Sequence, residues 1–315
     1  MTAINPSHIL KRSALAVVLA SVAPLTMATD QLLAPAEKRE GETALRWSQK
    51  LTCGTTEEGV TRYGMWEGKL YSRAPGEKDR HLFNVIGINV RQCEAHEDAA
   101  RGAGFRSVSR EIMVYLDPQT NEIIDRWRNP WTGMTVDVIH VANDPVNMRN
   151  PTYLRKADGS PLTVSLRRYD DTLVSSREIP LFYTNPLGGD YQEYVGGTYH
   201  AMEIFNTYYR ADDFLDDRRT RIGESRISWQ RISSWLPWMQ MGDRPGVMIF
   251  NATGYSSFER ERIPARLLQI LSDRFPAYLQ PPPLGDPRPN ETTWTVTKKI
   301  IDAQRKAPAQ TGSTR

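Results

Sequence analysis

The chain has 315 residues, with 40 lysine and arginine side chains against 37 aspartate and glutamate side chains, and a formal net charge of +3 at pH 7. Residues 1–28 hold two basic and no acidic side chains, so the rest of the chain has a net charge of only +1. Nucleic-acid-binding domains usually concentrate positive charge, and this near balance therefore argues against nucleic acid as the partner.

The N-terminus has the pattern of a secretory signal peptide. Lys11 and Arg12 precede an apolar run over residues 13–28 that is short for a membrane span and ends in small residues suited to cleavage. An uncleaved anchor is the alternative, and the Lys-Arg pair also resembles a weak twin-arginine export signal. We expect cleavage after Ala28 and a periplasmic or secreted protein with no stable membrane span.

Two cysteines, Cys53 and Cys93, lie forty positions apart. In an oxidising compartment they either form a disulfide or stay as separate thiols, and their spacing does not decide between these states. No Cys/His spacing suggests a zinc site, and no sequence motif demands a metal or another cofactor.

Short segments with apolar–polar alternation, separated by turn residues, dominate the chain and predict about ten antiparallel strands. Amphipathic helices are expected before them, over residues 36–52, and after them, over 263–275 and 292–306. The expected strands lie at 60–73, at 81–92, in a three-stranded meander at 111–147, at 162–171 and 176–186, in a long pair around Gly196 and Gly197, and at 225–235 and 246–258.

These elements predict a mainly β protein, an antiparallel β-barrel that is lipocalin-like in its broad plan and carries N-terminal and C-terminal helices. The expected organisation is a signal peptide over 1–28 and one barrel domain with its N-terminal helix over 29–279. Residues 280–315 are expected to form a proline-rich linker, the last helix and a disordered tail.

Three segments carry a family resemblance: YLDPQTNEIIDRWRNPWTG, HVANDPVN and WLPWMQMGDRPGVMIF. They resemble recurring segments of the bacterial family catalogued as domain of unknown function 1838. The resemblance extends from Trp47 to Pro283 and rests on long motifs with several Trp, Asn and Pro at fixed offsets. Because the family name records no activity, the resemblance implies no catalytic residue.

The meander at 111–147 holds more polar chemistry than a sheet core needs. Its DPQTN, NPWTG and NDPVN corners are largely explained as turns. We predict that His140, at the end of an apolar strand face, moves a proton and is oriented by Asp144 or Asn143. Arg126 is predicted to hold an anionic oxygen. The alternative is that His140 is a core histidine bonded to the backbone.

Two later segments are predicted to complete a ligand site. In residues 198–210 the inward face carries either His200 or Glu203, and alternation alone does not decide. In residues 227–246, Arg231 lies near a cluster of Trp and Met that either walls a pocket for a flat ligand or simply fills the core. The predicted ligand-binding residues are Trp127, Trp131, Asn143, His200, Glu203, Arg231, Trp235 and Trp238.

The sequence therefore predicts a small-molecule ligand, hydrophobic or aromatic, with or without a negative charge. The favoured function is a cofactor-independent enzyme of the lyase, isomerase or hydratase type. The alternative is a protein that binds or transports the same ligand unchanged, and a third possibility is an exported structural protein whose interior is filled. The sequence lacks GxSxG, P-loop and HExxH motifs, which disfavours the familiar hydrolase, nucleotide and zinc-protease chemistries. Neither the substrate nor the oligomeric state can be derived from the sequence.

Overall fold

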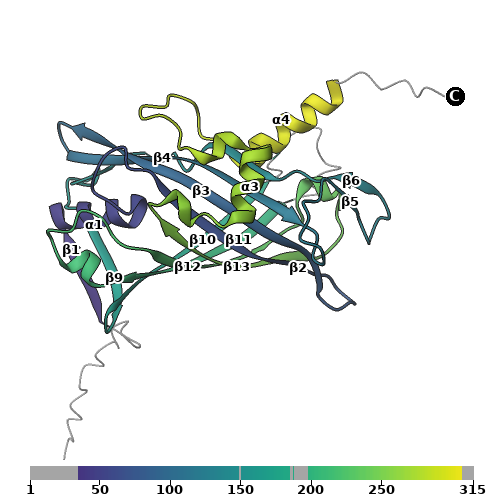
Figure 1. Ribbon diagram of the computed structural model, residues 1–315, viewed down its shortest axis with the longest axis horizontal. Helices are drawn as coiled ribbons and strands as arrows, with labels where there is room; N and C mark the ends of the chain where they lie inside the picture. Colours follow the sequence, from purple (N-terminus) through teal and green to yellow (C-terminus); the bar gives the residue numbers. More distant parts are fainter. Residues whose placement is uncertain (1–34, 149, 185–186, 188–197, 307–315) are drawn as a thin grey trace, which may run out of the picture. The chain divides into compact units, whose positions relative to one another are not determined.

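The computed structural model describes residues 35–306, with gaps at 149, 185–186 and 188–197. The predicted signal peptide, the predicted tail beyond residue 306 and the centre of the strand pair around Gly196 and Gly197 lie outside the described residues. Figure 1 shows the chain coloured along its sequence.

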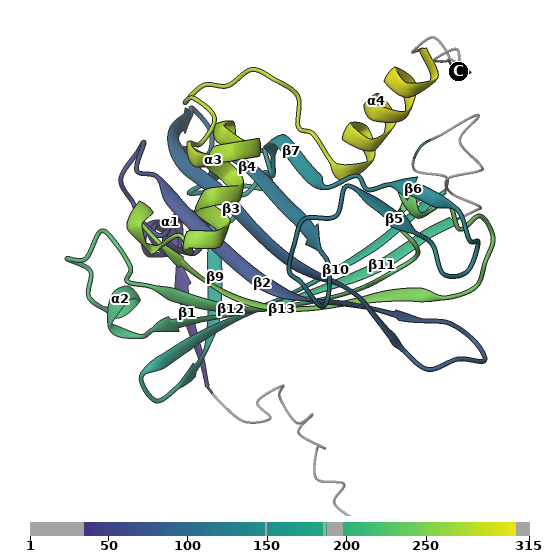
Figure 2. The ribbon, with the colours of Figure 1, turned by 45° about the vertical axis from the view of Figure 1, so that its right-hand side comes forward.

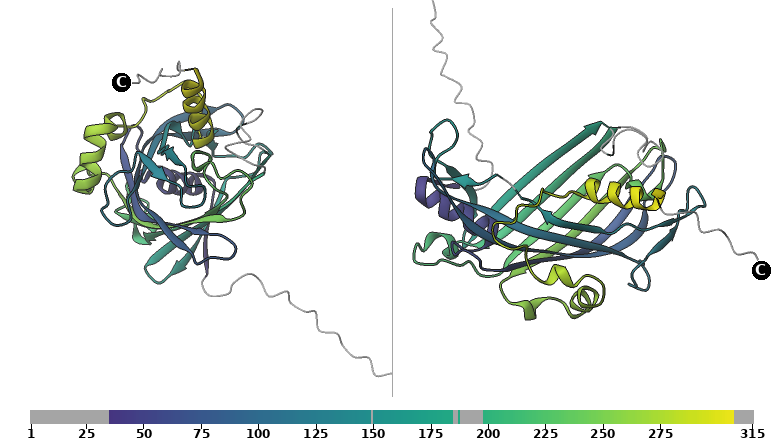
Figure 3. Two further views of the ribbon diagram at one scale, coloured as in Figure 1. Left: turned by 90° about the vertical axis from the view of Figure 1, so that its right-hand side faces the viewer. Right: turned by 90° about the horizontal axis from the view of Figure 1, so that it is seen from above.

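Eleven strands form one antiparallel sheet in the order β1-β9-β10-β11-β12-β13-β2-β3-β4-β7, and β8 pairs with β4. The sheet is strongly bent, as the end-on view in Figure 3 shows. The prediction of a mainly β, antiparallel protein is therefore confirmed. The strands are β1 (Ala36–Glu40), β2 (Arg62–Arg73), β3 (Arg80–Asp98), β4 (Gly102–Leu116), β7 (Val141–Val146), β8 (Thr152–Tyr153), β9 (Thr163–Tyr169), β10 (Thr172–Thr184), β11 (Thr198–Arg210), β12 (Ser225–Ser233) and β13 (Val247–Ser257).

Helices occur near both ends of the described chain, as the sequence predicts, and short helical turns join the later strands. No helix among the described residues is long and apolar enough to cross a membrane. The helices are α1 (Gly41–Cys53), α2 (Asp212–Leu215), α3 (Ala265–Arg274) and α4 (Thr293–Lys306), with 3-10 turns η1 (Pro237–Met239), η2 (Arg260–Arg262) and η3 (Pro276–Leu279).

The first helix begins later than the sequence predicts. Residues 36–40 form β1, which pairs with β9, and the turn into α1 is made at Gly41, where φ is +61°. The AEKRE segment favours a helix by intrinsic propensity, but its pairing with β9 and the packing of Arg39 over the Trp47 ring at 4.7 Å stabilise the strand. Tertiary contacts here outweigh local preference.

The convex face of the sheet is covered by α3. Alternate side chains of β2, β3 and β4 form a buried layer with the apolar face of this helix, and Figure 3 shows α3 outside the bend. The layer includes Met65, Ile88, Ile112, Val114, Leu267 and Leu271.

The meander predicted at 111–147 does not form a single sheet. After β4, residues 126–128 (β5) and 135–137 (β6) pair in a separate two-stranded sheet. Because β6 ends at Asp137, the prediction that His140 lies at the end of an apolar strand face is wrong. The chain rejoins the main sheet as β7, so NDPVN is strand rather than corner over residues 143–146. An edge strand tolerates Pro145, since its missing N–H can face away from the ladder.

Cys53 and Cys93 form a disulfide, with a Cα–Cα distance of 6.0 Å, which resolves the alternative left open by the sequence. The bond ties the end of α1 to β3. It lies in a small apolar cluster with Leu45 and Phe105, so α1 is fixed against β3 and β4 at one end of the bent sheet.

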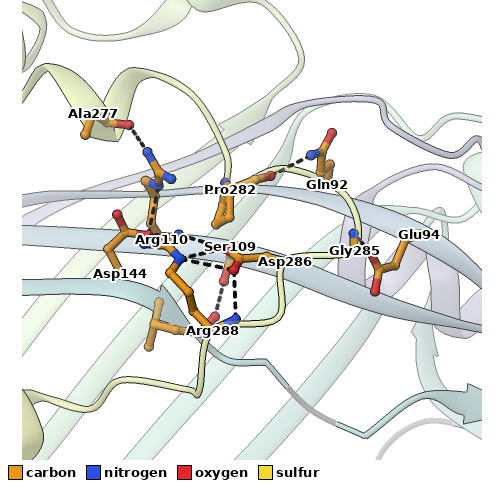
Figure 4. Close-up of polar contacts among 11 residues, drawn as sticks. Gln92, Glu94, Ser109, Arg110, Asp144, Ala277, Pro282, Gly285, Asp286 and Arg288 are labelled. Carbon is orange, nitrogen blue, oxygen red and sulfur yellow. Dashed lines mark hydrogen bonds and ion pairs between the residues drawn. The ribbon is translucent and has the colours of Figure 1, made fainter.

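Residues 280–292, which we call the C-terminal strap, bind to the edges of β3, β4 and β7 before α4 begins (Figure 4). Gln92 Nε2 donates to the carbonyl of Pro282 at 2.7 Å. Arg288 forms ion pairs with Asp286 at 2.6 Å and with Asp144 at 2.9 Å. The predicted proline-rich segment is thus held by directed polar contacts.

Candidate functional site

The concave face of the sheet carries an unusual set of charged side chains. Since Met65 and Ile112 face α3 on the convex side, their strand neighbours Trp66 and Glu111 point to the concave side. The ladders continue the same face through successive partners on β13, β12 and β11: Phe250, Arg231 and Glu203.

One wall of the concave face is built around Arg231. Its guanidinium forms an ion pair with Glu203 and donates a second hydrogen bond to the Tyr199 hydroxyl at 2.6 Å. Burial lowers the pKa of Arg231, but Tyr199 and Glu203 more than offset this and the net pKa is raised, so the guanidinium stays charged. The side chains of Arg231 and Glu203 keep 22% and 16% of their surface exposed, which leaves part of this charged pair reachable.

The opposite wall presents Glu111 on β4. Its carboxylate accepts a hydrogen bond from Asn89 Nδ2 at 3.3 Å, and Asn89 Oδ1 in turn accepts one from Arg91 Nε at 2.8 Å. Burial is the main cause that raises the pKa of Glu111; the charge of Glu203 adds to it, while Asn89, Arg91 and Arg231 oppose it. A raised pKa makes this carboxylate a stronger base than an ordinary glutamate.

Aromatic rings line the face between these walls. Trp229 stacks on Phe205, with centroids 6.2 Å apart and planes 19° apart, and contacts Phe250 at 5.5 Å. Trp66 lies over Gly87, where a Cβ would come within 2.5 Å of the indole, so only glycine leaves room for the ring. The indole N–H groups of Trp66 and Trp229 are buried and find no acceptor among the described residues. The wall is therefore a flat apolar surface that encloses two indole N–H groups.

The four tryptophans predicted as ligand-binding residues come together at one end of the concave face. Trp127 lies 6.3 Å from Trp131 and 5.9 Å from Trp238, and Trp131 lies 5.0 Å from Trp235, all between ring centroids. Trp235 and Trp238 are buried in the same cluster as Phe83. Their rings contact one another, so the core alternative describes this cluster better than an open pocket does.

His140 is buried beside the same cluster, where its ring lies nearly parallel to Tyr115, with an interplanar angle of 23°. Its Nδ1 accepts the backbone N–H of Tyr115 at 3.2 Å, and its Nε2 lies 3.8 Å from Asp125 Oδ1. Burial, with a smaller effect of Arg274, lowers the pKa of His140 to about 4, although Asp125 acts in the opposite direction. A neutral imidazole bonded to the backbone fits the structural alternative for this residue.

The predicted partners of His140 lie elsewhere. Asp144 pairs with Arg110 at 3.2 Å and with Arg288, on the convex side of β7. Arg126 is exposed and lies 3.7 Å from Asp137. The structure therefore does not bring His140, Asp144 and Arg126 into one site.

The two remaining predicted residues on β7 and β11 are placed by strand register. Asn143 is opposite Glu111 in the ladder, and its Nδ2 donates to Thr293 Oγ1 at 3.3 Å. His200 is exposed on the convex side, near Phe182, so Glu203 is the inward residue of β11. Of the predicted polar ligand-binding residues, Glu203, Arg231 and Asn143 thus lie on the concave face.

Sequence reasoning missed the opposite wall. Glu111 precedes the apolar run IMVYL, where both strand faces are apolar and alternation gives no inward side. Asn89 lies in a similar run within β3. The available signal was an acid directly before the apolar run of residues 112–116.

A metal-binding cluster and a surface hollow are two other kinds of site that a protein can offer. No group of three or more His, Cys, Asp or Glu side chains arranged to hold a metal ion occurs in the described part of the chain. A hollow of about 980 Å³ lies between α3 and strands β2, β12 and β13. It opens on the convex side, and its charged residues include Arg262 and Glu224, which pair with each other at 2.5 Å.

The family model described as "Protein of unknown function (DUF1838)" matches residues 59–301, which confirms the resemblance seen in the sequence. No curated protein shows significant similarity to the chain. Two crystal structures of Ail, the attachment invasion locus protein of Yersinia pestis, the second in complex with the heparin analogue sucrose octasulfate, are each 10% identical to the chain. They cover 64% and 62% of this chain and 99% of their own, but their TM-scores of 0.17 and 0.15 are too low to support an argument.

Proposed function

The chain belongs to the DUF1838 family, whose description assigns no activity, and we propose from the site alone that it binds a small, flat, anionic compound on the concave face and transfers a proton on it. The observation that carries this proposal is the placement of Glu111, with its raised pKa, on the wall opposite the charged Arg231 pair. A fold of this kind does not need charges on both inner walls to be stable.

In the bound state, Trp66 and Trp229 would contact the faces of the ligand. Arg231, held in place by Glu203 and Tyr199, would hold an anionic oxygen. This division of roles suits a compound with an aromatic or conjugated ring and a carboxylate or enolate oxygen.

Glu111 would be the proton-transfer group. As a carboxylate it would take a proton from a carbon next to a carbonyl, while Arg231 stabilises the negative charge that develops on the oxygen. Returning the proton to another atom is an isomerisation, and expelling a leaving group instead is a lyase reaction. His140 is not part of the proposed machinery, because it is buried beside the tryptophan cluster and its Nδ1 accepts the backbone N–H of Tyr115.

The wider setting is also proposed. The bent sheet would act as a barrel, lipocalin-like in plan, with α1 closing one end and the tryptophan cluster closing the other. The disulfide between Cys53 and Cys93 supports export to an oxidising compartment such as the periplasm, in line with the predicted signal peptide.

The test begins with native mass spectrometry of the protein purified from its own host, which identifies a bound small molecule by mass. That molecule is then incubated with the protein in D2O, and exchange of its C–H protons is followed by NMR. Exchange with wild-type protein that disappears in Glu111→Gln, with binding retained, is the expected result.

The matched control is Glu224→Gln, which changes an acid on the convex side. Binding without exchange in the wild type would contradict the enzyme hypothesis and favour a non-catalytic binding or transport protein. Unchanged affinity in Arg231→Gln would overturn the proposed binding site itself, because the predicted anion contact would then contribute nothing.

A further inference from the structure

The wall around the concave face is incomplete between β7 and β10. β10 pairs with β9 only over Thr172–Val174, so the rest of β10 has no strand partner on that side among the described residues. β7 is the other end of the sheet. Helix α4 lies between these two edges, where it contacts β7 (Figure 2).

The first turn of α4 contacts β7 on one side of this opening and β11, the neighbour of β10, on the other. Thr293 accepts a hydrogen bond from Asn143 of β7 at 3.3 Å. Trp294 packs edge-on against Tyr199 of β11, with ring centroids 4.5 Å apart and planes 78° apart. Tyr199 is only 1% exposed, and its hydroxyl is the one that binds Arg231. Trp294 therefore contacts Tyr199, which in turn binds the guanidinium of Arg231.

Helix α4 buries few apolar side chains. Among its residues only Thr297 and Ile301 are buried, and the apolar cluster around Ile301 is small. The polar strap supplies a further anchor, where the backbone N–H of Glu291 donates to the carbonyl of Pro145 at 2.7 Å. An element with few buried apolar contacts opens at low free-energy cost, whereas the strap keeps it attached.

We propose that α4 is a lid over the concave-face site and that Trp294 is the positioning residue that closes it and holds Tyr199 against Arg231. This rests on the proposed function, since the lid matters only if a ligand enters there.

The lid can be tested without any ligand through a thiol inside the site. Ser233 is 1% exposed, follows Arg231 on the same face of β12, and its hydroxyl makes no hydrogen bond among the described residues, so Ser233→Cys loses no partner. The two native cysteines are bonded to each other, so the new thiol alone reacts with 5,5′-dithiobis(2-nitrobenzoate). Its rate of modification then reports opening of the lid.

In the Ser233→Cys protein, adding Trp294→Ala is expected to raise the modification rate about tenfold, the ceiling for one lost aromatic pair. Trp294→Phe, which keeps a ring against Tyr199, should restore most of the protection, and Gln304→Ala on the exposed face of α4 should leave the rate unchanged. Far-UV circular dichroism checks that each variant is folded. Equal rates in the Ser233→Cys protein with and without Trp294→Ala would overturn the lid.

A second measurement separates this inference from the proposed function. Binding of the aromatic anion 1-anilinonaphthalene-8-sulfonate is followed by fluorescence in wild-type and Arg231→Gln protein. Binding that is equal in both would overturn the anion site while the thiol rates still decide the lid. Weaker binding in Arg231→Gln together with Trp294-dependent thiol rates supports both.

Discussion

Replacing His140 by glutamine distinguishes a structural histidine from a catalytic one. In the wild type, the folded state holds the pKa of His140 at about 4 instead of the usual 6.5. Each pKa unit is worth about 1.4 kcal/mol, so the folded protein resists this protonation by about 3 kcal/mol. Because the folded-state pKa is the lower one, this stability is fully present above pH 6.5 and is lost as the pH falls towards 4.

At pH 5 the unfolded histidine is almost fully protonated while the folded one is largely neutral, which removes about 2 kcal/mol of the free energy of unfolding relative to pH 7.5. His140→Gln has no titrating group but keeps an acceptor for the Tyr115 N–H. From pH 7.5 to pH 5, the free energy of unfolding of His140→Gln is expected to fall by about 2 kcal/mol less than that of the wild type. Other groups that titrate contribute equally to both proteins.

The assay is urea unfolding at pH 7.5 and pH 5.0 for both proteins, with the pKa of His140 measured separately by NMR of its ring protons. Equal pH dependence in the two proteins, or a measured pKa near 6.5, would refute the reasoning. Loss of C–H exchange in His140→Gln with an intact fold would return this residue to the catalytic machinery.

Three further predictions concern the framework of the site. Replacing both Cys53 and Cys93 by alanine is expected to cost about 4 kcal/mol of stability, since the disulfide closes a loop of 40 residues; denaturant unfolding of the double variant under oxidising conditions measures it, and a loss below about 1 kcal/mol would contradict the loop argument. Gly87→Ala should destabilise the protein by about 1–3 kcal/mol and displace Trp66, because the new Cβ meets the indole at 2.5 Å; a crystal structure with Trp66 unmoved would disprove the close contact. Glu111→Gln should be more stable than the wild type at pH 7, with the difference shrinking towards pH 4, because a folded-state pKa that is raised penalises the ionised form; thermal unfolding across pH checks the sign.

The fold class was predictable because strand alternation and turn residues are local signals. The helices at 265–274 and 293–306 were predictable from their periodicity for the same reason. The boundaries that failed depend on distant pairing. β1 is a strand because β9 lies beside it, and residues 143–146 are strand because β4 pairs with them. Neither partner is visible from the local sequence.

The sequence predicted one wall of the candidate site and missed the other. Arg231 was identified from the aromatic residues near it, and Glu203 was one of two alternatives, with His200, for the inward residue of its strand. The strand register selects Glu203 and makes it the direct partner of Arg231. Glu111 was missed because its importance comes from facing Arg231 across the bend, a relation between strands that are not adjacent in the sheet. Density of polar and aromatic residues in one segment instead directed attention to His140.

The tryptophan cluster beside His140 and the concave face around Glu111 differ in how their polar groups are held. Around the tryptophan cluster, Asn129 binds Met239 and Trp131, and His140 Nδ1 accepts a backbone N–H, whereas Trp238 Nε1 and His140 Nε2 have no hydrogen-bond partner among the described residues. On the concave face two indole donors likewise lack acceptors, and in addition the carboxyl group of Glu111 is held with its pKa raised. Each of these features lowers the stability of the folded state. Proteins retain such destabilising features mainly where they serve binding or catalysis. The concave face around Glu111 is therefore the part of the protein where a bound ligand best accounts for the residues present.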